Sequence, residues 1–351
     1  MLTRRFFSRL LPALGAAPLL PAIAGAQPAP LTRIAFGSCA DQDRPQPIWD
    51  AILAYRPELF IFAGDNVYGD FRTPDAAALK RAYDKAATVE GYRRLRETVA
   101  HLAIWDDHDY GQNDGGAAFP HKAHSKDLFL DFWKVPANDV RRQREGLYDS
   151  RIYGPPGMRV QVILLDTRWF RSPLKPTDKR DAPGRERYLP DPDPAKTVLG
   201  EAQWAWLAEE LRKPAEVRLL VSTIQILAEG HGWERWGNFP LERQKLFDTI
   251  HQSGARGVVL LSGDRHIGAL YKQDVPGLGM LYEMTSSGLN KTYPFSTEAG
   301  PNRIGPLYAA ANFGVVDIDW WARTVGLALR DESGTPRRSL TLTFDDLRLP
   351  P

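Results

Sequence analysis

Short apolar runs alternate with segments of helical periodicity along this chain, and the alternation restricts the fold more than any other property of the sequence. The runs have the length of buried strands, and the segments between them repeat apolar residues every three or four positions. This pattern is typical of α/β proteins. The expected strands are residues 33–36, 59–63, 101–105, 160–165, 218–221 and 257–261, and the expected helices are 48–55, 75–87, 90–100, 200–211 and 241–252.

The C-terminal part of the chain has a different pattern. Residues 315–318, 325–330 and 340–344 alternate apolar and polar side chains, which predicts antiparallel strands that complete a sheet. Residues 171–197 are rich in Pro, Asp, Lys and Arg without periodicity, which predicts a surface loop. With no internal repeat and no clear boundary, we expect one α/β sandwich domain over residues 31–351.

The first 26 residues have the pattern of an export signal. Arg4 and Arg5 precede an apolar stretch over residues 10–20, and a small-residue cleavage site follows at 24–26. The arginine pair predicts export of the folded protein by the twin-arginine (Tat) machinery, with an ordinary secretory signal as the alternative. The stretch is shorter than the ~20 residues of a membrane span and contains prolines. The expected location is therefore periplasmic or secreted.

Charge and cysteine content exclude two features. The chain has 45 basic and 43 acidic residues without a long block of one sign, so the sequence indicates no nucleic-acid-binding surface. Cys39 is the single cysteine, which excludes an intramolecular disulfide. Its thiol is either a small buried side chain or a ligand.

Four polar clusters each follow one of the apolar runs. They are residues 37–39, 64–68, 105–114 and 262–266. Taken singly, the clusters also fit a core cysteine, a capped turn, a solvated acidic turn and a buried salt bridge. Because ligand sites in α/β sheets assemble at the carboxyl ends of strands, we expect the four clusters to converge.

The donor types in these clusters indicate metal binding. The third cluster holds Asp106, Asp107, Asp109 and Asp114, whose mutual repulsion is costly without a cation. Together the clusters supply thiol, phenol, imidazole and oxygen donors, which suit a hard cation beside a transition metal. Two metal ions ~4 Å apart can share a bridging hydroxide and stabilise in-line displacement at phosphorus.

In this order, the four clusters resemble the motifs of the alkaline phosphatase D (PhoD-like) branch of the calcineurin-like metallophosphoesterases. The resemblance covers residues 31–290 and includes residues 165–168 and 236–240. It implies a sandwich of two mixed β-sheets flanked by helices and a phosphoesterase with a binuclear metal site.

The resemblance also implies a set of metal ligands. An Fe(III) ion would be bound by Cys39, Tyr68 and His266, and Asp65 would bridge it to a second ion. That second ion, Ca(II), would be bound by Asp107, Asn113 and Asp264. Gln225 is a further contributor, and either Asp106 or Asp107 binds directly.

Three further side chains are expected to act on the substrate. By the resemblance, His108 protonates the leaving group or binds the phosphate, with an orienting role as the alternative. Arg168 and Arg265 have guanidinium groups that can contact phosphate oxygens, although a structural ion pair is the alternative for both.

The predicted function is that of an exported hydrolase. It would cleave phosphodiesters, with phosphomonoesters as further substrates, by attack of a metal-bound hydroxide. The alternatives are a phosphomonoesterase or phospholipase-type esterase of the same fold and a non-catalytic, calcium-stabilised binding protein. A structural calcium site needs only oxygen ligands, so the presence together of Cys39, Tyr68, His108 and His266 argues against the last alternative.

Overall fold

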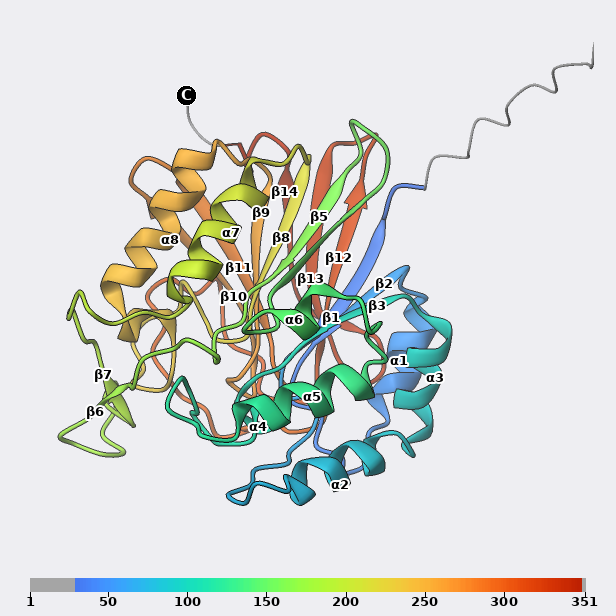
Figure 1. Ribbon diagram of the computed structural model, residues 1–351. Helices are drawn as coiled ribbons and strands as arrows, with labels where there is room; N and C mark the ends of the chain where they lie inside the picture. Colours follow the sequence, from blue (N-terminus) through green and yellow to red (C-terminus); the bar gives the residue numbers. More distant parts are fainter. Residues whose placement is uncertain (1–28, 349–351) are drawn as a thin grey trace, which may run out of the picture.

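A computed structural model describes residues 29–348, and these residues contain two stacked six-stranded β-sheets (Figure 1). The first sheet has the order β14 (Pro336–Thr343), β13 (Thr324–Arg330), β12 (Phe313–Asp319), β1 (Arg33–Gly37), β2 (Leu59–Ala63) and β3 (His101–Ile104). The second has the order β10 (Gly268–Val275), β11 (Gly279–Ser286), β9 (Val258–Ser262), β8 (Val217–Ser222), β5 (Val160–Leu164) and β4 (Asp149–Tyr153).

Both sheets are mixed. Strands β1, β2 and β3 are parallel, whereas β12 pairs antiparallel with β1 and begins the antiparallel run to β14. In the second sheet β5, β8, β9 and β11 are parallel, and the two edge strands β4 and β10 are antiparallel to their neighbours. The parallel strands of each sheet therefore direct their carboxyl ends to one edge.

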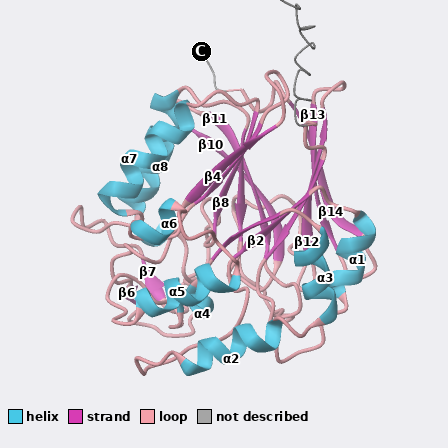
Figure 2. Cartoon of the chain, turned by 45° about the vertical axis from the view of Figure 1, so that its right-hand side comes forward, coloured by secondary structure: helices cyan, strands magenta, loops and turns pink. Residues whose placement is uncertain are grey.

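Helices cover the outer faces of the sandwich (Figure 2). Helices α1 (Ile48–Tyr55) and α3 (Glu90–Thr98) lie beside the first sheet, whereas α2 (Ala77–Ala86) and α5 (Lys122–Phe132) lie below the sheets in this view. The second is covered by α7 (Gly200–Arg212) and α8 (Pro240–Ser253). The short elements α4 (Asp107–Tyr110), α6 (Val140–Gln143), β6 (Lys175–Pro176), β7 (Tyr188–Leu189) and η1 (Trp236–Asn238) lie in the connections.

Two apolar cores hold these layers together. The larger contains side chains from both sheets, such as Phe36, Val162 and Val315, with residues of the helices on the first sheet. The smaller lies between the second sheet and its two helices and includes Leu220 and Leu246. Strands β5, β8 and β9 of the second sheet are buried along their whole length, which explains why their sequences are predominantly apolar.

The predicted fold class, two mixed sheets flanked by helices, is confirmed. The expected strands and helices are present, with ends shifted by a few residues, and the C-terminal strands are antiparallel. Strands β4, β10 and β11 and helix α5 were not predicted, and the expected loop 171–197 contains the small β6–β7 hairpin. The predicted export signal, residues 1–26, lies outside the described residues.

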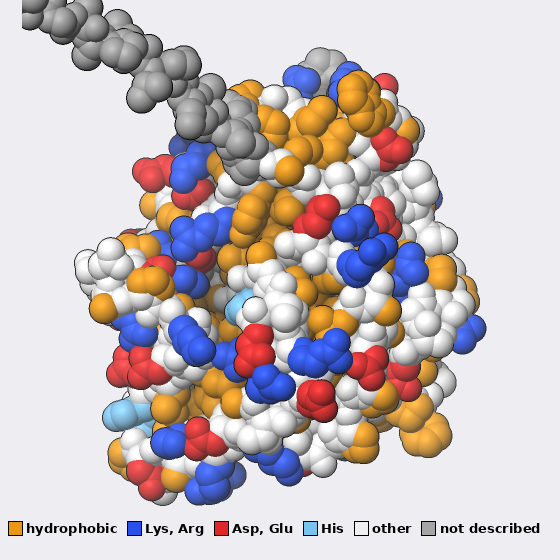
Figure 3. Space-filling view, turned by 90° about the vertical axis from the view of Figure 1, so that its right-hand side faces the viewer, with side chains coloured by type: hydrophobic (Ala, Val, Ile, Leu, Met, Phe, Trp, Pro, Cys, Tyr) orange, Lys and Arg blue, Asp and Glu red, His pale blue; other side chains and the backbone are white. Residues whose placement is uncertain are grey.

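Two surface properties complete the description. Within residues 29–348, no helix has the length and apolar character required to cross a membrane. On the face in Figure 3, Lys and Arg side chains are interspersed with Asp and Glu, as the near-equal numbers of basic and acidic residues predict.

Candidate metal centre

The four polar clusters converge at one end of the sandwich. Three of them follow the parallel strands β1, β2 and β3, and the fourth follows β9 of the other sheet. A parallel bridge between Ser38 and Ser287 joins the two sheets there. Glycine permits the close packing, because a Cβ on Gly64 would lie 2.5 Å from Cβ of Asp106 and a Cβ on Gly263 would lie 2.6 Å from Oγ of Ser38.

Asp65 lies between two groups of possible metal ligands. Its Oδ2 atom is 3.5 Å from Sγ of Cys39 and accepts a hydrogen bond from the Tyr68 hydroxyl at 3.0 Å. The same hydroxyl is 3.1 Å from Nε2 of His266. Ligand atoms of Cys39, Asp65 and His266 lie within 4.8 Å of one another. These residues are the set that the family resemblance implies for one metal ion.

Asp65 also belongs to a second group on the other side. Donor atoms of Asp65, Asp107 and His108 lie within 4.8 Å of one another, and so do those of Asp106, Asp107 and Asp264. Asn113 lies on the wall of the same cavity as Asp107 and Asp264. Asp65 thus belongs both to the group with Cys39 and His266 and to the group with Asp107 and His108.

The backbone of the centre is strained. The backbone has positive φ angles, between 49° and 68°, at Cys39, Asp65, Asp264 and His266. These angles lie in the left-handed region, which residues other than glycine rarely adopt. Such conformations persist where the surrounding structure fixes them, and they concentrate at functional sites. Four of the seven predicted ligands have this conformation, so we interpret the strain as a consequence of directing their side chains into one small volume.

The acidic side chains of the centre oppose one another electrostatically. Burial raises the pKa of Asp65 well above its ordinary value, and the charge of Asp107 raises it further. Burial and the charges of Asp106 and Asp107 raise the pKa of Asp264 in the same way. Burial also raises the pKa of the Cys39 thiol to about 11. These groups cannot all be ionised at neutral pH unless cations compensate their charge.

The two neighbouring aspartates have different surroundings. Oδ1 of Asp106 accepts hydrogen bonds from Arg168 at 2.5 Å and from the Thr223 hydroxyl at 2.6 Å, and Asp106 does not line the cavity. Asp107 lines the cavity, and its Oδ2 accepts the backbone amide of Asp114 at 2.6 Å. Oδ1 of Asp107, like Oδ2 of Asp106, is buried without a hydrogen-bond partner among the described residues. A cation would satisfy this oxygen, so the donor set fits a metal ion.

His108 is held by a carboxylate that the sequence analysis did not identify. Oδ2 of Asp70 lies 2.5 Å from Nδ1 of His108, and Oδ1 of Asp70 accepts the backbone amide of Asn113 at 2.7 Å. The side chain of His108 lies on the cavity wall, and its ring packs 4.4 Å from that of Tyr68. Asp70 stands alone in a loop with no sequence pattern, and only its proximity to the second cluster could have indicated a role.

The two arginines differ in their access to the cavity. Arg168 is fully buried and forms ion pairs with Asp106 at 2.5 Å and with Glu234 at 2.6 Å. This geometry corresponds to a structural ion pair, the alternative role that the sequence leaves open for Arg168. Arg265 lines the cavity and forms an ion pair with Glu298 at 2.6 Å. Of the two, Arg265 is the one placed to reach a ligand.

Gln225 has no free hydrogen-bonding group directed at the centre. Its Nε2 donates to Tyr271 at 3.0 Å and to Thr285 at 2.9 Å, while its Oε1 is 3.0 Å from Nε2 of His231. The side chain is fully buried and does not line the cavity. This network supports the fold of the neighbouring strands, and the role of Gln225 as a ligand stays a prediction.

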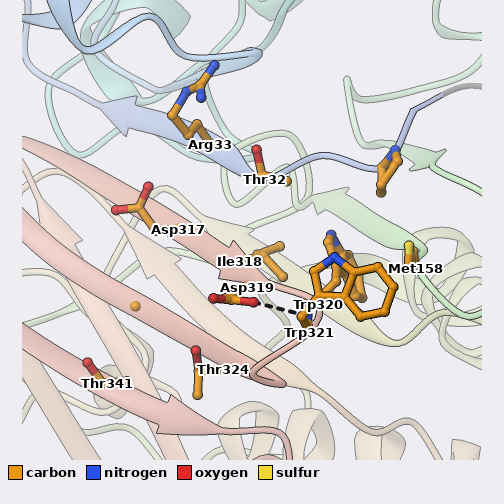
Figure 4. A pocket seen from close by; sticks show the side chains of 12 residues that line it. Thr32, Arg33, Met158, Asp317, Ile318, Asp319, Trp320, Trp321, Thr324 and Thr341 are labelled. Carbon is orange, nitrogen blue, oxygen red and sulfur yellow. Dashed lines mark hydrogen bonds between the residues drawn. The ribbon is translucent and has the colours of Figure 1, made fainter.

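The centre opens into a cavity of about 330 Å³. Besides predicted ligands, its wall includes side chains that the sequence analysis did not select, namely Asp114, Arg180, Arg187, Trp233, Glu234 and Tyr293. A larger depression of about 510 Å³ lies at the other end of the sandwich, where β1 begins and β12 ends. Trp320, Trp321 and Met158 form part of its wall (Figure 4). It contains none of the clustered donors, so size alone does not locate the chemistry.

Comparison with solved structures identifies the same fold in known phosphatases. The structure described as PhoD has a TM-score of 0.69 and 17% sequence identity, covering 92% of this chain and 70% of its own. Purple acid phosphatase PPD1 from yellow lupin (Lupinus luteus) seeds has a TM-score of 0.58 and 13% identity, covering 90% and 54%. At these identities the likeness establishes the fold.

Sequence comparison identifies the family. Alkaline phosphatase D of Bacillus subtilis (strain 168) is 24% identical in an alignment of 242 residues that covers 62% of this chain and 40% of the relative. The chain thus matches less than half the length of this relative. The description "PhoD-like phosphatase" belongs to the family model that matches residues 34–301. Because this match spans most of the chain and contains all four clusters, the protein belongs to the PhoD-like phosphatase family.

Proposed function

We propose that this protein hydrolyses phosphoesters, phosphodiesters first and phosphomonoesters in addition, at a centre that binds two metal ions. The observation that carries the proposal is the position of Asp65, whose carboxylate belongs to two groups of possible ligands beside a polar cavity. A single structural ion does not require this shared carboxylate. Membership of a phosphatase family and the match to alkaline phosphatase D support the reaction class.

The donor chemistry suggests different ions on the two sides of Asp65. Cys39, Tyr68 and His266 supply sulfur, phenol and imidazole, which suit Fe(III). Asp107, Asn113 and Asp264 supply oxygen, which suits Ca(II). When bound, such a pair supplies an activated water and compensates the charge of the phosphoryl group. We assign the direct contact to Asp107 because Asp106 is engaged by Arg168.

The residues around the cavity have separate roles in this proposal. Arg265 directs a positive charge at the cavity and can contact a phosphoryl oxygen. His108, oriented by Asp70, can hold a proton for the departing oxygen. Arg168 holds Asp106 in place and so supports the loop that carries Asp107 and His108.

Metal analysis and a substrate panel test the proposal together. Protein purified without added metal should contain iron and a second divalent ion, and it should hydrolyse bis(p-nitrophenyl) phosphate faster than p-nitrophenyl phosphate. Chelation should abolish both activities. Active protein that contains only zinc would refute the iron assignment, and metal-loaded protein without activity on any phosphoester would refute the function.

A spectroscopic variant tests the phenol ligand independently of turnover. Tyr68→Phe keeps the ring that packs against His108 and removes the hydroxyl that approaches Asp65 and His266. If the phenol oxygen binds Fe(III), the purified protein is coloured and the variant loses the visible charge-transfer band. An unchanged visible spectrum in an iron-loaded variant would show that Tyr68 is a packing residue.

We also propose export by the twin-arginine route to the periplasm or the medium. Its basis is the sequence of residues 1–26, with Arg4 and Arg5 before the apolar stretch. Replacing both arginines by lysine should retain the precursor in the cytoplasm, because this route requires the pair whereas ordinary secretion accepts lysine. Cell fractionation measures where the double variant accumulates. Normal export of this variant would support the ordinary secretory route.

A further inference from the structure

A second cavity of about 420 Å³ adjoins the metal centre. Trp233 and Tyr293 line both cavities and form the wall between them. Phe295 lines the second cavity and is 82% exposed, and Tyr293 is 46% exposed. These two exposed aromatic side chains, two residues apart on the wall of a cavity that adjoins a candidate active site, provide a surface suited to binding an organic group.

The loop that carries these aromatic residues is fixed to the metal centre at two points. The backbone amide of Tyr293 donates to the carbonyl of His266 at 2.9 Å. Farther along the same loop, Glu298 pairs with Arg265 at 2.6 Å, and the Glu298 side chain is 4% exposed. Because the loop is attached to two adjacent residues of the centre, Tyr293 and Phe295 keep a defined position relative to a bound phosphoryl group.

The charged side chains on the wall of the second cavity limit what it can bind. Among the described residues, they are the carboxylates Asp181, Glu186 and Glu298 without a lysine or arginine, whereas the wall of the metal cavity carries three arginines together with five carboxylates. With no cationic side chain from the described residues on its wall, the second cavity disfavours an anion such as a second phosphate. It also disfavours a cation against Trp233, since the guanidinium groups of Arg187 and Arg265 already lie 4.8 Å and 5.0 Å from that ring.

We propose that the second cavity binds the ester group of the substrate when this group is uncharged and aromatic, in contact with Phe295 and Tyr293. The inference rests on the proposed function, because it takes the metal cavity as the phosphoryl site. It predicts a preference for phosphodiesters of planar, neutral alcohols over those of small alkyl alcohols.

Binding of two non-hydrolysable phosphinates tests the proposal without turnover. Diphenylphosphinate and dimethylphosphinate carry the same anionic group and differ only in their organic substituents. Titration calorimetry of the metal-loaded protein should show tighter binding of the diphenyl compound. Phe295→Ala should weaken its affinity about tenfold and change that of the dimethyl compound by less than about twofold.

Two controls make the result specific. Trp321→Ala removes another exposed aromatic side chain, 91% exposed and remote from the metal centre, and should leave both affinities unchanged. Pyrophosphate, which has a second charged phosphate, should bind the wild type and Phe295→Ala equally. Equal binding of the two phosphinates, an equal loss of both in Phe295→Ala, or a loss of pyrophosphate affinity in that variant would each overturn the inference.

The outcome is separable from that of the proposed function. If the metal-loaded protein hydrolyses no phosphoester but binds diphenylphosphinate through Phe295, the hydrolytic proposal fails and the aromatic cavity stands. If it hydrolyses phosphoesters without a dependence on Phe295, the function stands and the aromatic cavity is wrong.

Discussion

In the proposed function, His108 acts on the oxygen that leaves the phosphoryl group. Its ring lies on the cavity wall beside Asp65 and Asp107. His108→Ala should slow substrates with alkoxide leaving groups by ~100-fold to ~10,000-fold, the range for a lost general acid. It should slow p-nitrophenyl esters much less, because nitrophenolate departs without a proton. Steady-state kinetics and metal analysis of the same sample provide the measurement.

The alternatives for His108 give different patterns. Equal losses for both leaving groups with normal metal content would indicate a phosphate contact. A loss of metal would indicate that His108 organises the centre.

Asp70 positions His108, so its replacement should reproduce the selectivity of the His108 variant in weaker form. Asp70→Asn removes the charge beside Nδ1 of His108 and should slow alkoxide leaving groups by roughly 10-fold to 100-fold, the range for an outer residue that orients a functional one. Asp84→Asn, an exposed change on α2, is the matched control. A loss independent of the leaving group would place the effect of Asp70 on Asn113 instead.

At the scale of elements, Glu242 joins the two helices on the second sheet. This buried residue of α8 accepts hydrogen bonds from Nε1 of Trp204 on α7 at 2.9 Å and from the backbone amide of Val198 at 2.6 Å. Glu242→Ala leaves these donors unpaired and should lower the free energy of unfolding by about 3 kcal/mol. Urea unfolding is the measurement, and Glu201→Ala on the exposed face of α7 is the control.

The predictability of each element follows from its burial. Strands buried on both faces, such as β2 and β9, consist almost entirely of apolar residues, and the sequence identifies them directly. Strand β4 contains Asp149, Ser150 and Arg151 and exists because it pairs with β5 at the sheet edge. Strands β10 and β11 form an eight-residue antiparallel ladder whose polar residues obscure the apolar pattern. Whether such segments form strands depends on pairing partners that are distant in sequence.

At the scale of the whole molecule, metal binding should stabilise the fold. The carboxylates of the centre are buried and repel one another, so the protein without metal keeps an electrostatic cost that cations remove. A metal at 100 times its Kd adds about 2.7 kcal/mol, so chelation should lower Tm by several degrees. Differential scanning calorimetry with and without a chelator checks this.

A charge variant gives the matched comparison. In Asp65→Asn the shared carboxylate is neutral, so the chelated variant should unfold at a Tm equal to or above that of the chelated wild type. The increase in Tm on metal addition should be much smaller for this variant than for the wild type. A Tm insensitive to chelation in the wild type would contradict the cation-binding role of the centre.

The sequence by itself determined the α/β class and the donor types of the centre. Both follow from short stretches of sequence. Each polar cluster directly follows an apolar run, and the donor atoms of Cys39, Tyr68 and His266 are set by the residue type. The tertiary structure decided the geometry, namely that Asp107 and not Asp106 lines the cavity, that Asp70 contacts His108, and that Arg168 is fully buried. Distances between residues far apart in the chain arise from the packing of the two sheets, and no local pattern records that packing.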